Sequence, residues 1–349
     1  MMDANNKLKQ QMKNTIIILS LISIVFTLSC TKDIGTEIII SVSSTDLIVG
    51  NEIILEAENE MGEDISADVN FHVNDVKIKE SNFIAEEEIA HAIYAEYDGL
   101  VSNTITINPY KLAPDSYEKK LFVEEFGATW CGYCPHLVSA ITKAKEDLSS
   151  ELVVVTHQAS GDFSSEYFDY LFKEKYEMSG MPQTVIEGVE KEWAFAGTLR
   201  KYEDETPSVG MSLSTKMTAS DYDVKLTIGM GKELPSAIAY TIYLVESNIV
   251  VPQSNFDNEE VDSPFFSLGN PIEDFVHDNV LRECITDIDG DQVPEDKIKE
   301  NRIYELSISR AFPSSILDRN NLKVIAVAWE GEKAINAQQV ELGGKISYN

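Results

Sequence analysis

Basic residues are scarce in this chain of 349 residues, and their scarcity excludes whole classes of partner. Only 28 lysines and arginines stand against 59 aspartates and glutamates, which gives a formal net charge of −31 at pH 7. Nucleic acids and anionic lipid headgroups are themselves polyanions and repel such a protein. We therefore expect no nucleic-acid partner and no attachment to a membrane through surface charge.

Cysteine is also rare, with four in the whole chain. Cys131 and Cys134 form a C-x-x-C pair, Cys30 ends an N-terminal apolar stretch, and Cys284 stands alone. A single cysteine of this kind is typically a small buried hydrophobic residue, and we expect that of Cys284.

The apolar run from Thr15 to Ser29 is too short to be a comfortable permanent membrane span, and it follows a segment with three lysines. It predicts a signal peptide over residues 1–29. The ending Thr27-Leu28-Ser29-Cys30 resembles a bacterial lipobox, although Thr27 stands where leucine is usual. That resemblance implies lipidation at Cys30 and a membrane anchor through the lipid. An ordinary signal peptide cleaved nearby, or an uncleaved anchor, is the alternative.

Two blocks of short apolar runs separated by turn residues predict β-structure on either side of a different central block. After a tether at residues 30–36, residues 37–108 predict a small β-sandwich, similar to the immunoglobulin-like modules of bacterial envelope proteins. Residues 207–349 predict a second, antiparallel β-sandwich. Hydrophobic residues make up 43% of the chain, which is enough for packed cores in two or three domains.

The central block, residues 115–205, has the order strand, helix, strand, helix, strand. Leu121–Phe126 is the first strand and leads into the C-x-x-C pair, and an amphipathic helix follows over Pro135–Leu148. A helix N-terminus offers unpaired N–H groups that favour a thiolate on the first sulfur, and the second sulfur is close enough to close a disulfide. Leu152–Val155 is an apolar run typical of a strand covered on both faces.

Two short motifs in this block resemble the landmarks of the thioredoxin fold. W-C-x-x-C at Trp130–Cys134 follows a strand, and the segment Gly180–Thr184 precedes one. The resemblance implies a thioredoxin-like α/β domain with a cis Met181–Pro182 bond facing the cysteines. It also implies that an extended substrate segment pairs with the backbone beside that bond.

Roles for single residues follow from the same resemblance. Cys131 is expected to be the exposed nucleophile, Cys134 the buried resolving thiol, and Trp130, Met181 and Pro182 the substrate-binding surface. Glu125 occupies the position of a buried acid that shuttles a proton to the resolving cysteine. A partly solvated acid at the end of a strand is the alternative for Glu125.

Three neighbouring features have competing interpretations. Glu124 and Glu125 oppose thiolate formation by like charge. His136 either tunes the cysteine pair or is a surface histidine without a role. The run Asp287–Asp291 opens like a calcium-binding loop, but Gln292 and Ile298 stand where that loop needs glycine and glutamate. A solvated acidic turn is the better interpretation, and calcium binding by this run is left open.

Other cofactors do not fit the cysteine spacing. Haem attachment needs C-x-x-C-H, and Pro135 stands in the place of that histidine. A zinc site needs a second pair of ligands. We expect no metal and no organic cofactor.

The stretch His277–Arg282, together with the lipobox, the leading sandwich and the central block, resembles the outer-membrane-protein-twenty-eight-related family of bacterial envelope lipoproteins. Asp278 departs from that family's pattern, and we expect His277 and Arg282 to be structural. The resemblance implies a lipid-anchored outer-membrane protein that faces the periplasm or the cell surface. We expect it to exchange disulfides with protein or peptide thiols as an oxidoreductase. A non-catalytic binding or scaffold lipoprotein is the alternative, and the sequence alone leaves enzyme activity undecided.

Overall fold

A computed structural model of the protein describes residues 34–45, 47–112, 117–159, 161, 163–192 and 196–347. The expected signal peptide and Cys30 lie outside these residues. Two compact units are present. The first comprises the residues up to Ser43 with Ile54–Asn82 and His91–Thr106, and the second comprises Ser44–Ile53, Phe83–Ala90 and Ile107–Asn349. In the described part of the chain, no helix is both long enough and apolar enough to span a membrane.

The N-terminal strands form two sheets, as predicted for a β-sandwich. In β2 every second residue is buried, the pattern of a strand with one face on a core. The sheet orders are β1-β2-β5 and β4-β3-β6-β7, with β8 paired to β6. The strands are β1 (Ile38–Val42), β2 (Glu52–Asn59), β3 (Asn70–Val73), β4 (Val76–Lys77), β5 (Asn82–Ile84), β6 (His91–Tyr97), β7 (Leu100–Val101) and β8 (Ile105–Ile107).

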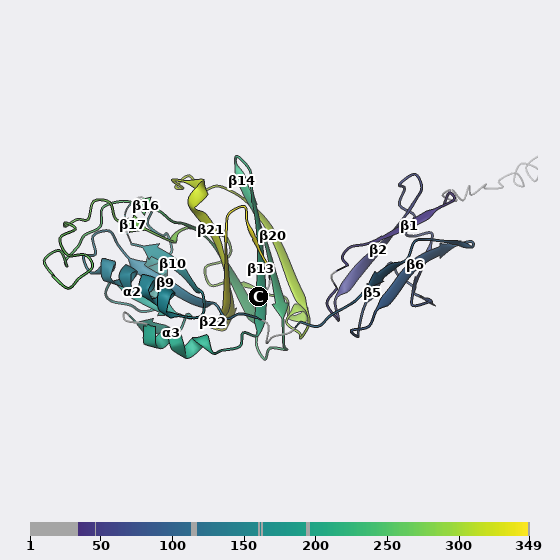
Figure 1. Cartoon of the computed structure of the whole chain (residues 1–349), viewed down its shortest axis with the longest axis horizontal. Coiled ribbons are helices and arrows are strands. Elements are labelled where there is room, and N and C mark those ends of the chain that lie inside the picture. The colour runs from purple at the N-terminus through teal and green to yellow at the C-terminus, as the bar shows by residue number, and fades with distance from the viewer. Residues whose placement is uncertain are drawn as a thin grey trace, which may run out of the picture. The chain divides into compact units, whose positions relative to one another are not determined.

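A nine-stranded mixed sheet runs through the second unit (Figure 1). In sheet order its strands are β12 (Glu190–Glu192), β11 (Gln183–Ile186), β9 (Leu121–Gly127), β10 (Leu152–Gln158), β18 (Val280–Cys284), β15 (Ile238–Glu246), β21 (Leu322–Glu330) and β22 (Lys333–Glu341), with β19 (Asp291–Gln292) on β15. β9, β10 and β18 are parallel to one another, and the other neighbours are antiparallel.

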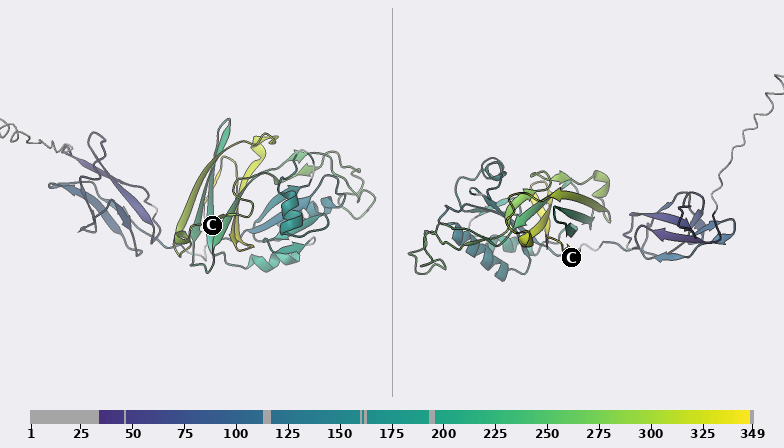
Figure 2. Two further views of the ribbon diagram at one scale, coloured as in Figure 1. Left: turned by 180° about the vertical axis from the view of Figure 1, so that it is seen from behind. Right: turned by 90° about the horizontal axis from the view of Figure 1, so that it is seen from above.

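A four-stranded sheet lies against the C-terminal half of the large sheet, and Figure 2 shows the two as layers. Its order is β20-β14-β13-β23. Leu226, Ile228, Ile242 and Ala326 are among the buried residues of the core between the layers. The strands are β13 (Val209–Met217), β14 (Asp221–Met230), β20 (Ile303–Ala311) and β23 (Lys345–Ile346).

Helices cover the part of the large sheet that contains β9. α2 (Cys134–Asp147) begins with Pro135 in its first turn, where a missing N–H costs no hydrogen bond. Its buried stripe packs on β9 and β10 together with Leu199 of α3 (Ala196–Glu203). The predicted second helix is a short π-helical segment over Tyr170–Lys175 rather than an α-helix.

The large sheet crosses the domain boundary that the sequence predicts at residues 205–207. β9 and β10 come from before this boundary, and β18, β15, β21 and β22 come from after it. β10 joins the two groups by pairing with β18 at Thr156 and Val280. The apolar run of β10 is thus covered by strands on both edges and packed on both faces, as expected for a parallel strand.

A buried ion pair joins the segment before β9 to the residue that follows β11. Lys119 Nζ lies 2.7 Å from Glu187 Oε2, and both side chains are buried. The ammonium group also donates to the carbonyl of Ile335 at 3.3 Å. Glu187 in turn accepts a hydrogen bond from the N–H of Phe122 at 2.9 Å.

We predict that Lys119→Met lowers the free energy of unfolding by about 3–5 kcal/mol, because it leaves the Glu187 carboxylate buried without its partner. Adding Glu187→Gln removes the charge but keeps an acceptor for Phe122. We therefore expect the double variant to regain most of the loss in urea-induced unfolding. A double variant as unstable as Lys119→Met would contradict this account.

Candidate functional site

The cysteine pair lies where the fully buried strand β9 leaves the sheet. Cys131 and Cys134 form a disulfide with their Cα atoms 5.4 Å apart, and Cys134 is the first residue of α2. The loop between strand and helix is held by hydrogen bonds from Cys131 N to the carbonyl of Ala128 (3.0 Å) and from Cys134 N to that of Cys131 (3.1 Å). Sequence motif and helix start therefore coincide as predicted.

Both cysteines are buried, so the expectation of an exposed Cys131 is wrong. Each residue exposes 5% of its surface. Ala128, Ala159 and Met181 pack around the pair and shield it. The Met181–Pro182 peptide bond is cis, which confirms that prediction and places Met181 beside the cysteines. Trp130, in contrast, is 58% exposed, so the loop reaches the surface at this residue.

A distant segment that no sequence motif revealed binds this loop. We call Gln253–Asp257 the strap. Its Ser254 N donates to the carbonyl of Thr129 at 2.8 Å, and Phe256 N donates to that of Gly132 at 3.0 Å. Two backbone hydrogen bonds therefore hold the strap to the cysteine loop.

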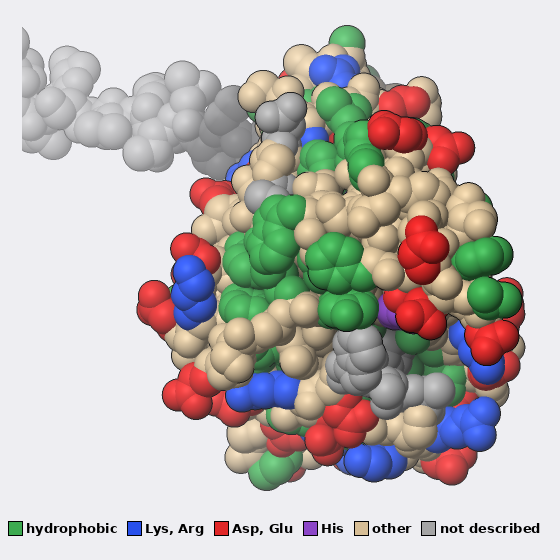
Figure 3. Space-filling view, turned by 90° about the vertical axis from the view of Figure 1, so that its left-hand side faces the viewer, with side chains coloured by type: hydrophobic (Ala, Val, Ile, Leu, Met, Phe, Trp, Pro, Cys, Tyr) green, Lys and Arg blue, Asp and Glu red, His purple; other side chains and the backbone are tan. Residues whose placement is uncertain are grey.

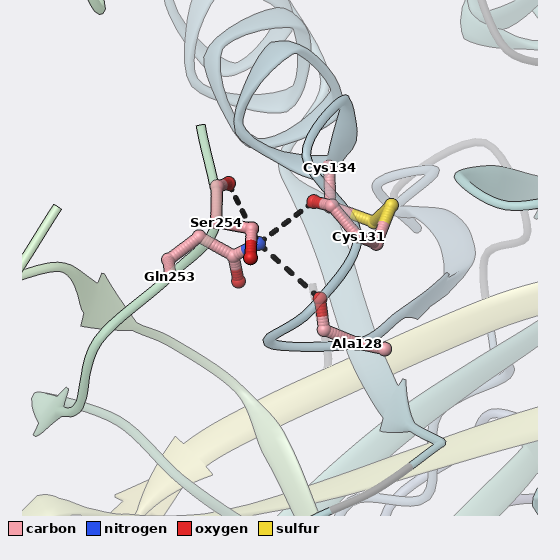
Figure 4. The surroundings of a disulfide bond; sticks show 5 residues. All are labelled: Ala128, Cys131, Cys134, Gln253 and Ser254. Carbon is pink, nitrogen blue, oxygen red and sulfur yellow. Dashed lines mark hydrogen bonds between the residues drawn. A yellow bond between two sulfur atoms is a disulfide. The ribbon is translucent and has the colours of Figure 1, made fainter. Parts of the chain in front are cut away.

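Gln253 anchors the strap from a buried position (Figure 4). Its Nε2 lies within hydrogen-bonding distance of the carbonyls of Ala128 (3.2 Å), Cys131 (2.8 Å) and Ser254 (3.2 Å). One side-chain amide thus satisfies carbonyls from both segments. An isolated glutamine in a loop has no local pattern that could reveal such a role.

Aromatic and ionic contacts add to the strap. The ring of Phe256 lies on Gly132, where a Cβ atom would overlap it, and meets Tyr133 edge-on at 5.2 Å. His136 Nε2 contacts a carboxylate oxygen of the buried Asp257. His136 is therefore held by the strap.

Glu125 is buried on the α2 face of the sheet, which excludes the partly solvated alternative. Burial raises the pKa of its carboxyl to about 7, although a hydrogen bond from Thr156 (2.9 Å) and the charge of Lys145 act in the opposite direction. Glu125 and Cys134 line the same cavity of about 50 Å³, together with Gln158 and Gln253. A cavity of this volume can hold water, through which a proton can pass.

Glu124 faces the other side of the sheet, because successive residues of a strand alternate. Burial raises the pKa of its carboxyl. Hydrogen bonds from His157 (3.1 Å) and Tyr176 and the charge of His157 outweigh that effect, so the net pKa lies below the usual range. The two acids were expected to act alike on the cysteines, but they lie in different environments.

The side chains at both ends of the stretch His277–Arg282 are buried and contact neighbouring residues. Arg282 Nε lies 3.1 Å from Glu246 Oε2, with both side chains buried. His277 is buried against Phe275 and Phe163, and burial lowers its pKa. Cys284 is a buried free thiol whose pKa burial raises to about 12, which confirms the expectation of a small hydrophobic residue.

Carboxylates of the acidic turn Asp287–Asp291 accept hydrogen bonds from other groups of the protein. Asp289 accepts hydrogen bonds from Tyr170 Oη (2.6 Å) and Lys175 Nζ (2.9 Å). Asp287 Oδ1 accepts one from Asp289 N at 2.9 Å. Within the described residues, no three histidine, cysteine, aspartate or glutamate side chains are grouped so that they could hold a metal ion.

Comparison with known proteins identifies a family. A family model described as "Outer membrane protein Omp28" matches residues 170–345, about half of the chain. None of the curated proteins matches the chain.

Two solved structures are similar to the protein. HBP35 of Porphyromonas gingivalis has a TM-score of 0.51 and 19% identity, over 65% of this chain and 76% of its own. At this identity the likeness concerns the fold alone. Protein AGR_C_4864 from Agrobacterium tumefaciens matches 65% of this chain and 96% of its own with 14% identity, and its TM-score of 0.40 is too low to carry an argument.

We predict that Glu125 makes the protein less stable as pH rises from about 4.5 to 8. Its pKa is about 7 in the folded state and about 4.3 in an unfolded chain, so between these values the folded state binds more protons. The expected loss is about 3 kcal/mol across this range. In Glu125→Gln that loss should be missing from urea unfolding curves recorded at the two ends of the range. Parallel pH dependence in both proteins would contradict the raised pKa.

We predict that Gly132→Ala displaces the strap, because the new Cβ overlaps the Phe256 ring. We expect it to cost about 1–3 kcal/mol and to speed proteolytic cleavage within residues 251–275. Gly180→Ala is the matched control, since a Cβ there meets nothing within 4 Å. Equal cleavage of the two variants would show that the strap does not depend on this contact.

Proposed function

We propose that this chain, which belongs to the outer membrane protein Omp28 family, exchanges disulfides with protein or peptide thiols through Cys131 and Cys134. Its family makes it an envelope-associated protein of the outer membrane. We also propose that Cys30 carries a lipid anchor. Exchange at the cysteine pair goes beyond the family assignment and rests on the site.

One observation carries the proposal: the disulfide at the start of α2 shares a cavity with a buried carboxyl that titrates near neutral pH. A staple needs the two sulfur atoms but has no use for a proton acceptor. The cis Met181–Pro182 bond beside the pair, and the order β9, α2, β10, β11, support a thioredoxin-like arrangement for this part of the sheet.

The exchange can be written from these groups. In the reduced protein the Cys131 thiolate attacks one sulfur of a substrate disulfide, forms a mixed disulfide and releases the first substrate thiolate. Cys134 gives its proton to Glu125 and attacks the Cys131 sulfur, which releases the second thiolate. Two electrons pass to the substrate, and the protein is left with the disulfide seen in the structure. The reverse sequence oxidises a substrate dithiol.

Glu125 suits the proton step. A base works best when its pKa is near the working pH, and burial brings that of Glu125 to about 7. Lys145 lies on the same cavity, and its positive charge favours the ionised carboxyl. Glu125 is therefore proposed as the acceptor of the Cys134 proton and its donor in the reverse direction.

The second candidate is a binding or scaffold protein in which the disulfide is only a staple. Burial of both cysteines and the hydrogen bonds of the strap to their loop favour this candidate. In that case neither sulfur meets a partner, and the β-sheets present the functional surface.

We predict that Cys134→Ser traps mixed disulfides on Cys131 in the native host, because the resolving thiol is missing. The adducts should appear on non-reducing gels and disappear with reductant. Cys131→Ser/Cys134→Ser is the matched control and should trap nothing. If Cys134→Ser forms no adduct and the wild-type protein does not reduce insulin, the scaffold candidate is favoured.

A further inference from the structure

The loop of residues 251–275 leaves the sheet beside the cysteine pair and returns to it. β16 (Ile249–Val250) and β17 (Val276–His277) pair at its base. Its strap contacts the C-x-x-C loop, as described above. The rest of the loop is fixed by internal bonds: Asn255 Nδ2 donates to the carbonyls of Phe265 and Gly269, each at 2.9 Å. The loop is therefore an ordered segment with a defined surface next to the disulfide.

Large apolar side chains stay on the outside of this surface. Phe256 is 57% exposed, and Tyr133, which it contacts, is 51% exposed. Figure 3 faces this end of the second unit and shows hydrophobic side chains gathered on it. We call the following exposed residues the apolar patch: Trp130, Tyr133, Phe256, Val261, Phe266 and Leu268. Contiguous exposed apolar side chains rimmed by polar residues mark interaction surfaces.

Acidic side chains flank the patch. Residues 251–275 include no lysine or arginine and six acids, of which Asp257 is buried against His136 and the other five are exposed. We call these five exposed acids the acidic rim. The segments 126–142 and 176–190, which supply the cysteines and the cis proline, also lack lysine and arginine. These exposed acids attract a positively charged partner and repel a negatively charged one. Small acidic thiols are therefore repelled.

We propose that the 251–275 loop is a docking surface for an extended polypeptide segment that carries aromatic or aliphatic residues flanked by lysine or arginine. The inference rests on the proposed exchange reaction and names the substrate class of that site. The apolar residues of the segment lie on the patch, its basic residues lie over the acidic rim, and its cysteine is brought to Cys131. The patch is continuous with the cysteine loop through the contact of Phe256 with Gly132 and Tyr133.

Docking can be measured apart from exchange with redox-silent peptides and the oxidised full chain. Two fluorescent peptides share the core Phe-Ser-Leu and differ only in their flanks, which are lysine in one and glutamate in the other. We expect the lysine peptide to bind more tightly in anisotropy titrations, with an advantage that shrinks as salt is added. Phe256→Ala should weaken its binding about five- to tenfold, because exposed aromatic anchors dominate such contacts.

Two matched controls test the assignment. Leu317→Ala removes another exposed apolar side chain, one outside the loop, and should leave binding unchanged. Glu259→Gln/Glu260→Gln should reduce the preference for the lysine peptide about two- to fivefold. The same change at Glu86 and Glu87, two exposed acids outside the loop, should not.

The outcomes separate this inference from the proposed function. If both peptides bind equally, or if Phe256→Ala and Leu317→Ala behave alike, the docking surface is overturned, whatever the cysteines do. Repeating the titrations with cysteine in place of serine and following disulfide formation tests exchange. Selective binding with no exchange would overturn the proposed reaction, and with it the assignment of the docked segment as a substrate.

Discussion

The site depends on burial of β9 on both faces. Every residue of this strand is buried, so the side chains on both of its faces lie in packed regions. Its two neighbouring acids therefore lie in different interiors: Glu124 is stabilised as a charged group by His157 and Tyr176, and Glu125 shares a cavity with Cys134. The loop that carries the cysteines leaves the end of this strand, and its position is fixed by the packing of the strand.

Features governed by nearby residues were predictable from the sequence. The strand and the helix that begins at the C-x-x-C pair follow from motifs of a few residues, and the structure contains both. The cis bond before Pro182, which is also present, was expected from the resemblance to the thioredoxin fold. Burial of Cys284 followed from its isolation. For the strand and the helix, local chemistry decides the conformation, so a short window of sequence carries the information.

Features that depend on distant contacts were not predictable. β10 pairs with β18 at Thr156 and Val280. The sequence of an apolar strand does not determine which of the other strands it will pair with. The role of Gln253 could not be predicted either, because it depends on the contact between the strap and the cysteine loop. Cys131 was expected to be exposed, and it is buried because Met181, fifty residues along the chain, packs against it.

The shared sheet also bears on how this architecture can change over evolutionary time. Phe122, Val153 and Val155 belong to the same apolar cluster as Tyr243, Leu281 and Trp329, and the open edge of β10 is filled by β18. A segment cut out at residue 205 would carry an unpaired, apolar strand edge into solvent, the kind of edge that invites aggregation. The segment is thus ill suited to recombination as a free-standing cassette, and its inheritance is tied to that of the strands that follow it.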